Sequence, residues 1–465
     1  LYPTAMRLPF PDLLATRNGR LAAFFLLYMT EGIPLAFTAT AIATQMRRQG
    51  VGPEMIGAFV GSLYLPWAFK WIAGPFVDTF SSDRFGRRRL WILLMQIGMA
   101  LTLLVAYPID FVNSLAMFTL VIAVHNAFAA TMDVAIDALA CNVLPESERG
   151  VANGFMFGGA SVGQTIGGAM VLFLTSIMPF QATYFFVIGV ILLVTIFVVL
   201  PLREKAGPVR PAIVGSRARA VTNDLRAFVV SAYRAFVGTR AALVGVLSAL
   251  LPLGAYALSL ALQSTLAVEL GFDDQQVATI SLWSTIIFAV ACISGGWFSD
   301  RFGRRRTLAI FISLTAVPTL YLAWQLQAHN WIHSIPANAP DRPPVPAPLV
   351  TAFWIAVLSY NVFQGLYYGI RSALFMDITT PAVAATQFTA YMAMQNFAIS
   401  YTSTWQGFAI TRFGYPTTLV LDSIAGLLPL ALLPFMAPPK RGATSAGQTP
   451  RALRPGEAIP DGLGP

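Results

Sequence analysis

The sequence predicts an all-α, polytopic membrane protein with twelve transmembrane helices arranged as two six-helix bundles. Of its 465 residues, 56% are hydrophobic and only 11% are charged, whereas a soluble globular protein carries about 25% charged residues. Apolar runs of about 18 or more residues recur, and each is long enough to cross a bilayer. The stretch DRFGRRR occurs twice, at 83–89 and 300–306, which indicates an internal duplication of the kind that transporters show.

Hydropathy gives six candidate helices on each side of a polar connector. The first six are expected at 21–45, 55–78, 90–108, 113–141, 151–176 and 181–201, and the second six at 240–266, 275–298, 307–326, 349–378, 387–410 and 415–436. The expected organisation is therefore an N-terminal bundle over 1–201, a cytoplasmic connector over 202–239, a C-terminal bundle over 240–436 and a disordered cytoplasmic tail over 437–465.

Basic residues predict the orientation of the chain. With the N-terminus in the cytoplasm, 24 of the 30 Lys and Arg residues fall on the cytoplasmic side, four on the opposite side, and two, Lys70 and Arg371, inside helices. This excess satisfies the positive-inside rule with both termini cytoplasmic. The net charge of +9 is then explained by topology and requires no nucleic-acid partner. We expect a multi-pass protein of the bacterial inner membrane that works as a monomer.

The sequence does not indicate an enzyme. Cys141 and Cys292 both lie in apolar segments and suggest neither a disulfide nor a metal site. A glycine series over 154–168 follows no strand, so it predicts a close-packing helix face and not a nucleotide loop. We expect no catalytic residues, no cofactor and no metal.

The duplicated loop is the first candidate for function, because both copies fall in equivalent cytoplasmic loops. An Asp at a helix end that accepts from Arg groups can hold one state of a gate and release it in another. The bland alternative is a solvated basic loop that serves only topology. The gating candidates are Asp83, Arg84, Gly86, Arg87 and Arg88 in the first copy and Gly296, Asp300, Arg301, Gly303, Arg304 and Arg305 in the second.

This loop resembles the G-x-x-x-D-R-x-G-R-R motif of the major facilitator superfamily, although Thr79 stands where the first copy needs its leading Gly. Four further stretches resemble the peptide, acetyl-CoA and drug transporter branch, which includes AmpG-type muropeptide permeases and siderophore permeases. They are GIPL at 32–35, FKW at 69–71, the helix-four aspartates followed by LPESERG at 144–150, and ATQF at 385–388. The resemblance adds Glu148 and Arg149 to the gating candidates, and it implies that helices one, four, seven and ten line a central cavity. The chain departs from the branch at Met132, Leu139 and Tyr360.

Carboxyl groups inside the predicted helices are candidates for binding protons or substrate. Glu31 lies within the first predicted helix, beside the point where Pro34 opens it. It could bind a proton or a cationic group, or be neutralised by a neighbouring helix. Asp133 and Asp137 are four residues apart and share one helix face, where two close carboxylates resist ionising together. Asp137 could instead contact only the cytoplasmic loop.

Two basic residues inside the predicted helices complete the charged set. Lys70 could pair with Asp133 or Asp137, attract an anionic substrate, or extend to the cytoplasmic surface. Arg371 is suited to binding a carboxylate or phosphate through its guanidinium fork. Uncharged candidates on the presumed cavity helices are each also consistent with interhelical packing. They are Gln263 and Tyr256 on the seventh helix and Asn361, Gln364, Tyr367 and Tyr368 on the tenth.

These features predict a secondary active transporter that moves a small polar substrate, with an anionic group favoured by Arg371, by alternating access and proton coupling. The resemblance favours muropeptide uptake first, and a siderophore or other small molecule second. The alternative of another class is a membrane assembly factor that has the same fold and transports nothing. The charges on helices one, four and ten favour transport.

Overall fold

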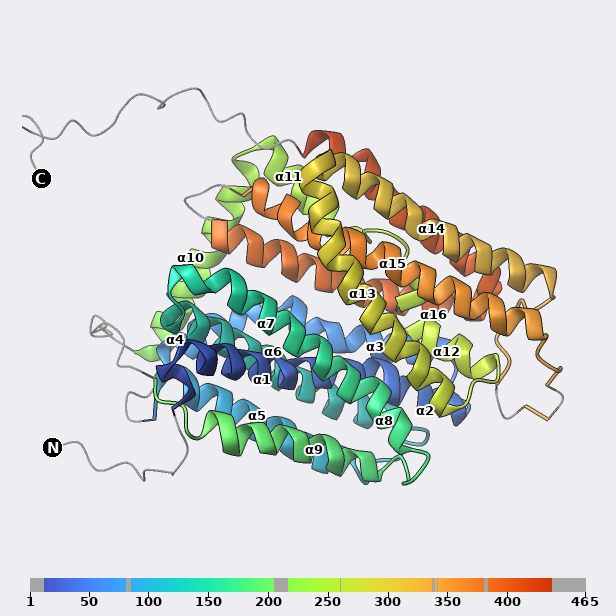
Figure 1. Ribbon diagram of the computed structural model, residues 1–465, viewed down its shortest axis with the longest axis horizontal. Helices are drawn as coiled ribbons and strands as arrows, with labels where there is room; N and C mark the ends of the chain where they lie inside the picture. The colour runs from blue at the N-terminus through green and yellow to red at the C-terminus, as the bar shows by residue number, and fades with distance from the viewer. Residues whose placement is uncertain are drawn as a thin grey trace, which may run out of the picture.

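The computed structural model describes residues 12–80, 85–204, 216–259, 261–336, 339–340, 342–379 and 384–436. Long helices run side by side along the molecule, with the first half of the chain below the second in Figure 1. The N-terminal half contains α1 (Arg17–Ala36), α2 (Ala43–Arg48), α3 (Pro53–Ala68), α4 (Ala73–Thr79), α5 (Arg87–Ala106), α6 (Leu115–Val143), α7 (Glu146–Thr165), α8 (Val171–Leu174) and α9 (Ala182–Val194). The connecting helix α10 (Arg217–Val237) precedes the C-terminal half, which contains α11 (Arg240–Ala249), α12 (Ala261–Glu269), α13 (Asp274–Phe302), α14 (Arg304–Ala328), α15 (Ala347–Asp377) and α16 (Ala384–Leu427). We call the end of the bundle where α1 begins and α10 lies, at the left of Figure 1, the inner end, and the opposite end the outer end.

Ten helical runs in the described ranges are long and apolar enough to cross a membrane. The C-terminal half contains a helix break that was not predicted and a helix boundary that was. The helix expected at 240–266 is broken between α11 and α12, where Pro252 lacks an amide donor and Gly254 has a φ of +90°. The helices expected at 387–410 and 415–436 are both present within α16, which consists of two helices that meet at Gly414, where a φ of +79° and a ψ of 173° are not helical.

The glycine-rich helix α7 packs directly on the backbone of α1. A Cβ added at Gly159, Gly163 or Gly167 would lie 2.1, 2.0 or 2.2 Å from a carbonyl oxygen of α1. Only glycine allows two helix backbones to approach so closely. The close-packing face predicted for this helix is therefore confirmed.

The two halves meet along α3 and α16. A Cβ on Gly57 would lie 2.5 Å from the carbonyl oxygen of Ser403, and a Cβ on Gly61 would lie 2.5 Å from that of Ser400. The Ser400 hydroxyl donates to the Gly61 carbonyl across this interface at 2.7 Å. Salt bridges from α2 to α12 and α13 join the halves again at the outer end, so the structure is closed there.

Candidate functional site

A cluster of charged side chains forms inside the N-terminal half. Lys70 lies in the 3-10 turn Lys70–Ile72, which interrupts the helical run between α3 and α4. Its ammonium forms a salt bridge with Asp133 of α6. The Asp133 side chain is 3% exposed and that of Lys70 is 20% exposed. Of the two partners that the sequence allowed for Lys70, the structure selects Asp133.

The other two carboxyl groups of this cluster are held near α1. The Tyr28 hydroxyl donates to Asp137, and Glu31 follows Tyr28 by about one helical turn. Glu31 lies close enough to Asp133, Lys70 and Asp137 for their charges to act on it. Its Oε2 is buried without a hydrogen-bond partner. Glu31, Lys70, Asp133 and Asp137, which the sequence singled out separately, therefore lie together, and we call them the acidic cluster.

The acidic cluster carries three carboxyl groups and one ammonium. If every group were ionised, two negative charges would remain uncompensated inside the membrane, which is costly. Asp137 is exposed and Glu31 is half-buried, so the cluster is accessible to small solutes. The arrangement can exchange protons. No group of His, Cys, Asp or Glu side chains that could bind a metal ion occurs among the described residues.

A second site surrounds Arg371 of α15 in the C-terminal half. The Arg371 guanidinium lies 4.3 Å from the ring centroid of Tyr368 and interacts electrostatically with Tyr256 and Tyr367. Tyr64, from α3 of the other half, interacts with Tyr256 and Tyr368. The Nε of Arg371 and the hydroxyls of Tyr256 and Tyr367 are buried without hydrogen-bond partners. Buried donors of this kind require an acceptor, so this arginine–tyrosine site suits an anionic or carbonyl oxygen.

Asp422 of α16 supports this second site and was not predicted. One carboxylate oxygen accepts from the backbone amides of Tyr256 and Ala257 at 2.8 and 2.9 Å, and the other accepts from Gln406 at 2.6 Å. Asp422 thereby holds the break between α11 and α12 and positions Tyr256 beside Arg371. It lies within a predicted helix, so the rule that identified Glu31 could have found it.

Of the uncharged candidates, the three tyrosines lie at the arginine–tyrosine site, whereas the three amides contribute less than the sequence suggested. Asn361 is buried and donates to the Val357 carbonyl of its own helix at 2.8 Å. Gln263 and Gln364 are half-buried on α12 and α15. None of the contacts recorded for the acidic cluster or for Arg371 involves these three residues, so their binding role stays a prediction.

The two copies of the duplicated loop share a backbone turn. Gly86 and Gly303 directly precede α5 and α14, and both have a φ of +87°, a conformation that favours glycine. Asp83 and Arg84 lie outside the described residues, as do the side chains of Asp300 and Arg149. The predicted pairing of the loop aspartates therefore stays untested.

The described arginines of the two copies have different partners. Arg88 forms a salt bridge with Asp78 at the end of α4, whereas Arg304 pairs with Asp377 at the end of α15 at 2.6 Å. Arg304 corresponds to Arg87 and Arg88 corresponds to Arg305, so the two ion pairs are formed by different positions of the repeat. Among the remaining candidates, Arg305 donates to the Pro434 carbonyl at 3.3 Å, Arg301 lies 5.9 Å from the Trp297 ring, and Arg87 and Gly296 are half-buried.

Glu148 at the start of α7 pairs with Arg20 of α1. The guanidinium donates to both carboxylate oxygens, at 2.9 and 2.7 Å. The hydrogen bonds from Arg20 lower the pKa of Glu148 below its usual range. This bidentate contact joins α1 to α7 at the inner end, within the N-terminal half.

The outer end contains charged contacts that the sequence analysis missed. Arg47 and Glu269 form a salt bridge at 2.5 Å between α2 and α12. Arg48 pairs with Asp274 at the start of α13, and Asp274 also accepts from Gln45 at 2.7 Å. The signal was present, because Arg47 and Arg48 are two of the four basic residues placed on the side that the positive-inside rule leaves depleted.

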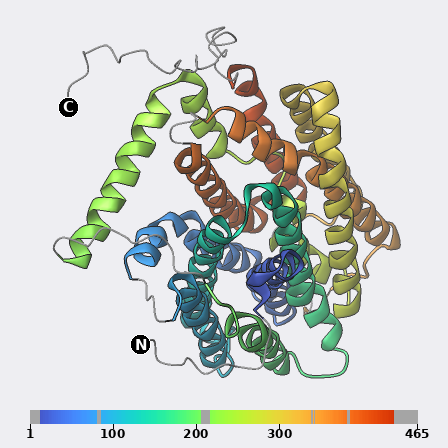
Figure 2. The same ribbon diagram turned by 60° about the vertical axis from the view of Figure 1, so that its left-hand side comes forward.

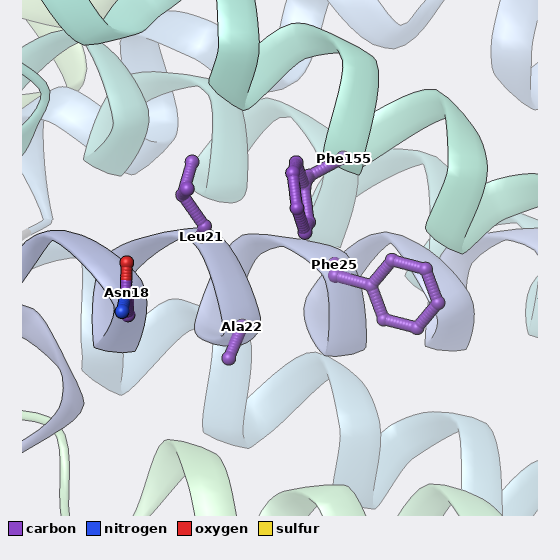
Figure 3. A pocket seen from close by; sticks show the side chains of 5 residues that line it. All are labelled: Asn18, Leu21, Ala22, Phe25 and Phe155. Carbon is purple, nitrogen blue, oxygen red and sulfur yellow. The ribbon is translucent and has the colours of Figure 1, made fainter.

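A surface cavity of about 340 Å³ lies between α1 and α7 (Figure 3). No residue of the acidic cluster or of the arginine–tyrosine site lines it, and its walls are largely apolar, so it is not the candidate binding site. The lining residues are Asn18, Leu21, Ala22, Phe25 and Phe155.

Two curated relatives are permeases or transporters by name. The chain is 26% identical over 425 residues to the anhydromuropeptide permease of Escherichia coli (strain K12), covering 90% of this chain and 79% of that protein. It is 26% identical over 300 residues to the putative transporter AmpG 4 of Rickettsia conorii, covering 63% of this chain and 71% of that protein.

The fold is similar to that of solved transporters. A D-xylose-proton symporter superimposes with a TM-score of 0.66 at 12% identity, over 90% of this chain and 97% of that one. The nucleoside transporter NupG superimposes with a TM-score of 0.65 at 15% identity, over 90% and 100%. The family model for the Major Facilitator Superfamily matches residues 21–253 and 244–461. The chain therefore belongs to the Major Facilitator Superfamily of secondary transporters and is distantly homologous to anhydromuropeptide permeases.

Proposed function

We propose that this transporter imports an anhydromuropeptide across the bacterial inner membrane together with protons, with both termini in the cytoplasm. The observation that carries the proposal is that a cluster of carboxyl groups and an arginine–tyrosine site lie in different halves of the transporter. The acidic cluster lies in the N-terminal half, and the arginine–tyrosine site lies in the C-terminal half. A site divided in this way binds two different species and releases both when the halves rock apart.

The acidic cluster supports proton coupling. Its excess of carboxyl groups over ammonium groups favours uptake of a positive charge when water is excluded. Lys70 and Asp133 neutralise one another, which leaves Glu31 and Asp137 as the groups that take up the transported proton. Release follows when the cluster meets the less acidic side of the membrane.

The arginine–tyrosine site supports a substrate that carries both a carboxylate and a sugar or peptide. Arg371 is buried and has no carboxylate partner among the described residues. A substrate carboxylate can therefore accept a hydrogen bond from its guanidinium group. The tyrosine rings offer flat apolar faces and hydroxyl donors to a sugar or an amide. An anhydromuropeptide combines these groups, and the distant relationship to anhydromuropeptide permeases favours it over other anions.

Reconstituted protein tests the proposal directly. Proteoliposomes loaded at neutral pH and diluted into buffer at about pH 6 should accumulate labelled anhydromuropeptide, and collapse of the gradient with a protonophore should stop the accumulation. Uptake that ignores the gradient would contradict proton coupling. Uptake of a ferric siderophore or another anion in place of the muropeptide would overturn the substrate assignment and keep the transporter.

A further inference from the structure

The connecting helix α10 has one face fixed to the transporter. Figure 2 shows it along one edge of the inner end, beside both halves. Phe228 stacks on Trp71 of the N-terminal half with ring centroids 5.2 Å apart, and Phe236 packs on Tyr391 of the C-terminal half at the same separation. These contacts set the rotation of the helix about its axis.

A second face of α10 exposes large apolar side chains. Val229, Val230, Tyr233 and Val237 are 50%, 38%, 68% and 59% exposed. At about 100° per residue, these four side chains project into one sector about 100° wide, and the fixed residues project into a different one. A helix that faced only water would carry polar residues there.

Basic side chains share the exposed apolar side of α10. Arg219 and Arg226 project into the same sector and Arg234 lies beside it, and all three are exposed. Asp224, the acidic residue of this helix, projects to a different side. Apolar residues flanked by arginines match a membrane surface, where acyl chains lie beneath anionic headgroups.

We propose that α10 binds the anionic lipid headgroups of the leaflet at the inner end of the transporter. The valines and Tyr233 enter the boundary between headgroups and acyl chains, and Arg219, Arg226 and Arg234 contact lipid phosphates. Because α10 also contacts Trp71 and Tyr391, the bound leaflet would restrain both halves at this end. The inference depends on membrane insertion and does not depend on the identity of the substrate.

The test places an environment-sensitive label on the exposed face. The protein carries Tyr233→Cys, and Cys141→Ser and Cys292→Ser remove the two native thiols. It is labelled with bimane at position 233. The labelled protein is reconstituted in nanodiscs of phosphatidylcholine that contain a minor fraction of quencher-labelled lipid. A quencher on phosphatidylglycerol should quench about threefold or more strongly than the same quencher on phosphatidylcholine, because three arginines enrich the anionic lipid. High salt should reduce this difference, since it screens the charges.

Matched variants separate charge from packing. Replacing Arg219, Arg226 and Arg234 by Gln should bring the two quenchers to the same efficiency, whereas Lys at the same positions should preserve the preference. Equal quenching by both lipids in the parent protein would overturn the proposal. A lipid preference that survives the Gln variant would also overturn it, as would a label freely quenched by aqueous iodide, which would assign the face to a protein partner or to water.

Discussion

Arg47 and Glu269 form a salt bridge of 2.5 Å between the two halves, with side chains only 1% and 0% exposed. Glu269 also accepts from the hydroxyls of Tyr415 and Ser334 at 2.6 and 2.7 Å and from the backbone amide of Ile335 at 3.0 Å. The carboxylate therefore has four polar protein partners. Closure of the outer end joins four chain segments through this one group.

Glu269→Gln should shift the transporter toward conformations that are open at the outer end. Removing one partner of a buried ion pair costs about 3–5 kcal/mol, and opening the outer end rehydrates Arg47. Spin labels at Gln49 and Gln275, which are exposed on opposite halves, should report a longer distance by pulsed electron spin resonance. Arg412→Gln removes an exposed charge outside these contacts and should leave the distances unchanged. An unaltered distribution in Glu269→Gln would show that the salt bridge does not hold this end closed.

Asp422→Ala should destabilise the protein by about 2–4 kcal/mol, because the buried amides of Tyr256 and Ala257 lose their acceptor. Asp422→Asn is the matched control. Its oxygen can still accept from both amides, and the Oε1 of Gln406, buried without a partner, can turn to accept from the new amide. We therefore expect Asn to cost less than about 1 kcal/mol. Thermal unfolding in detergent compares the two, and equal losses would contradict the positioning role of the Asp422 oxygens.

The sequence allowed prediction of those features that depend on composition and spacing. Apolar runs predicted the helices, and the glycines of α7 predicted a close-packing face, which the structure places against α1. Charge at bilayer depth selected Glu31, Lys70, Asp133 and Asp137, which the fold brings together. The predictions of the helices and of the packing face succeeded because each depends on residues that are close in the sequence. A binding role for the four charged residues stays a prediction.

Features that depend on two distant segments were not predicted. The break between α11 and α12 is stabilised by Thr315, Tyr360 and Asp422, which satisfy its backbone groups from three other segments. The helix break could be suspected from Pro252 and Gly254, but its partners are 60 or more residues away. Pairing of Arg47 with Glu269 likewise depends on how the halves close, which residue spacing does not encode.

Lys70→Gln should abolish uptake driven by a pH gradient and preserve exchange of substrate across a membrane without a gradient. The substitution leaves the nearly buried Asp133 without its counter-ion, so the cluster can no longer cycle between two protonation states. Counterflow in proteoliposomes measures exchange, and gradient-driven accumulation measures coupling. Lys70→Gln combined with Asp133→Asn should recover thermal stability lost by the single variant, because both charges are removed together. Equal loss of both transport modes would place Lys70 in substrate binding.

Arg371→Gln should weaken substrate binding by about 1–3 kcal/mol, the scale of a charge-assisted hydrogen bond. Arg371→Lys should recover only part of that loss, because an ammonium keeps the charge but not the planar fork or the stacking over Tyr368. Binding of anhydromuropeptide to purified protein, measured by calorimetry, gives both values. A substrate analogue without its carboxylates should bind the parent and Arg371→Gln equally. Unchanged affinity for the full substrate would exclude Arg371 from the site.

Gly303→Ala should destabilise the protein by about 1–2 kcal/mol, because a side chain at a φ of +87° is strained even where space is open. Gly296 provides the control within the same motif. It lies inside α13, and a Cβ there would meet nothing within 4 Å, so Gly296→Ala should be neutral or stabilising through its better helix propensity. Gly86→Ala should match or exceed the loss at Gly303, since its Cβ would also approach Glu204 at 3.2 Å. Thermal unfolding of the three variants checks this order. Equal effects of Gly296→Ala and Gly303→Ala would contradict the prediction, because they would show that the left-handed conformation at Gly303 does not contribute to stability.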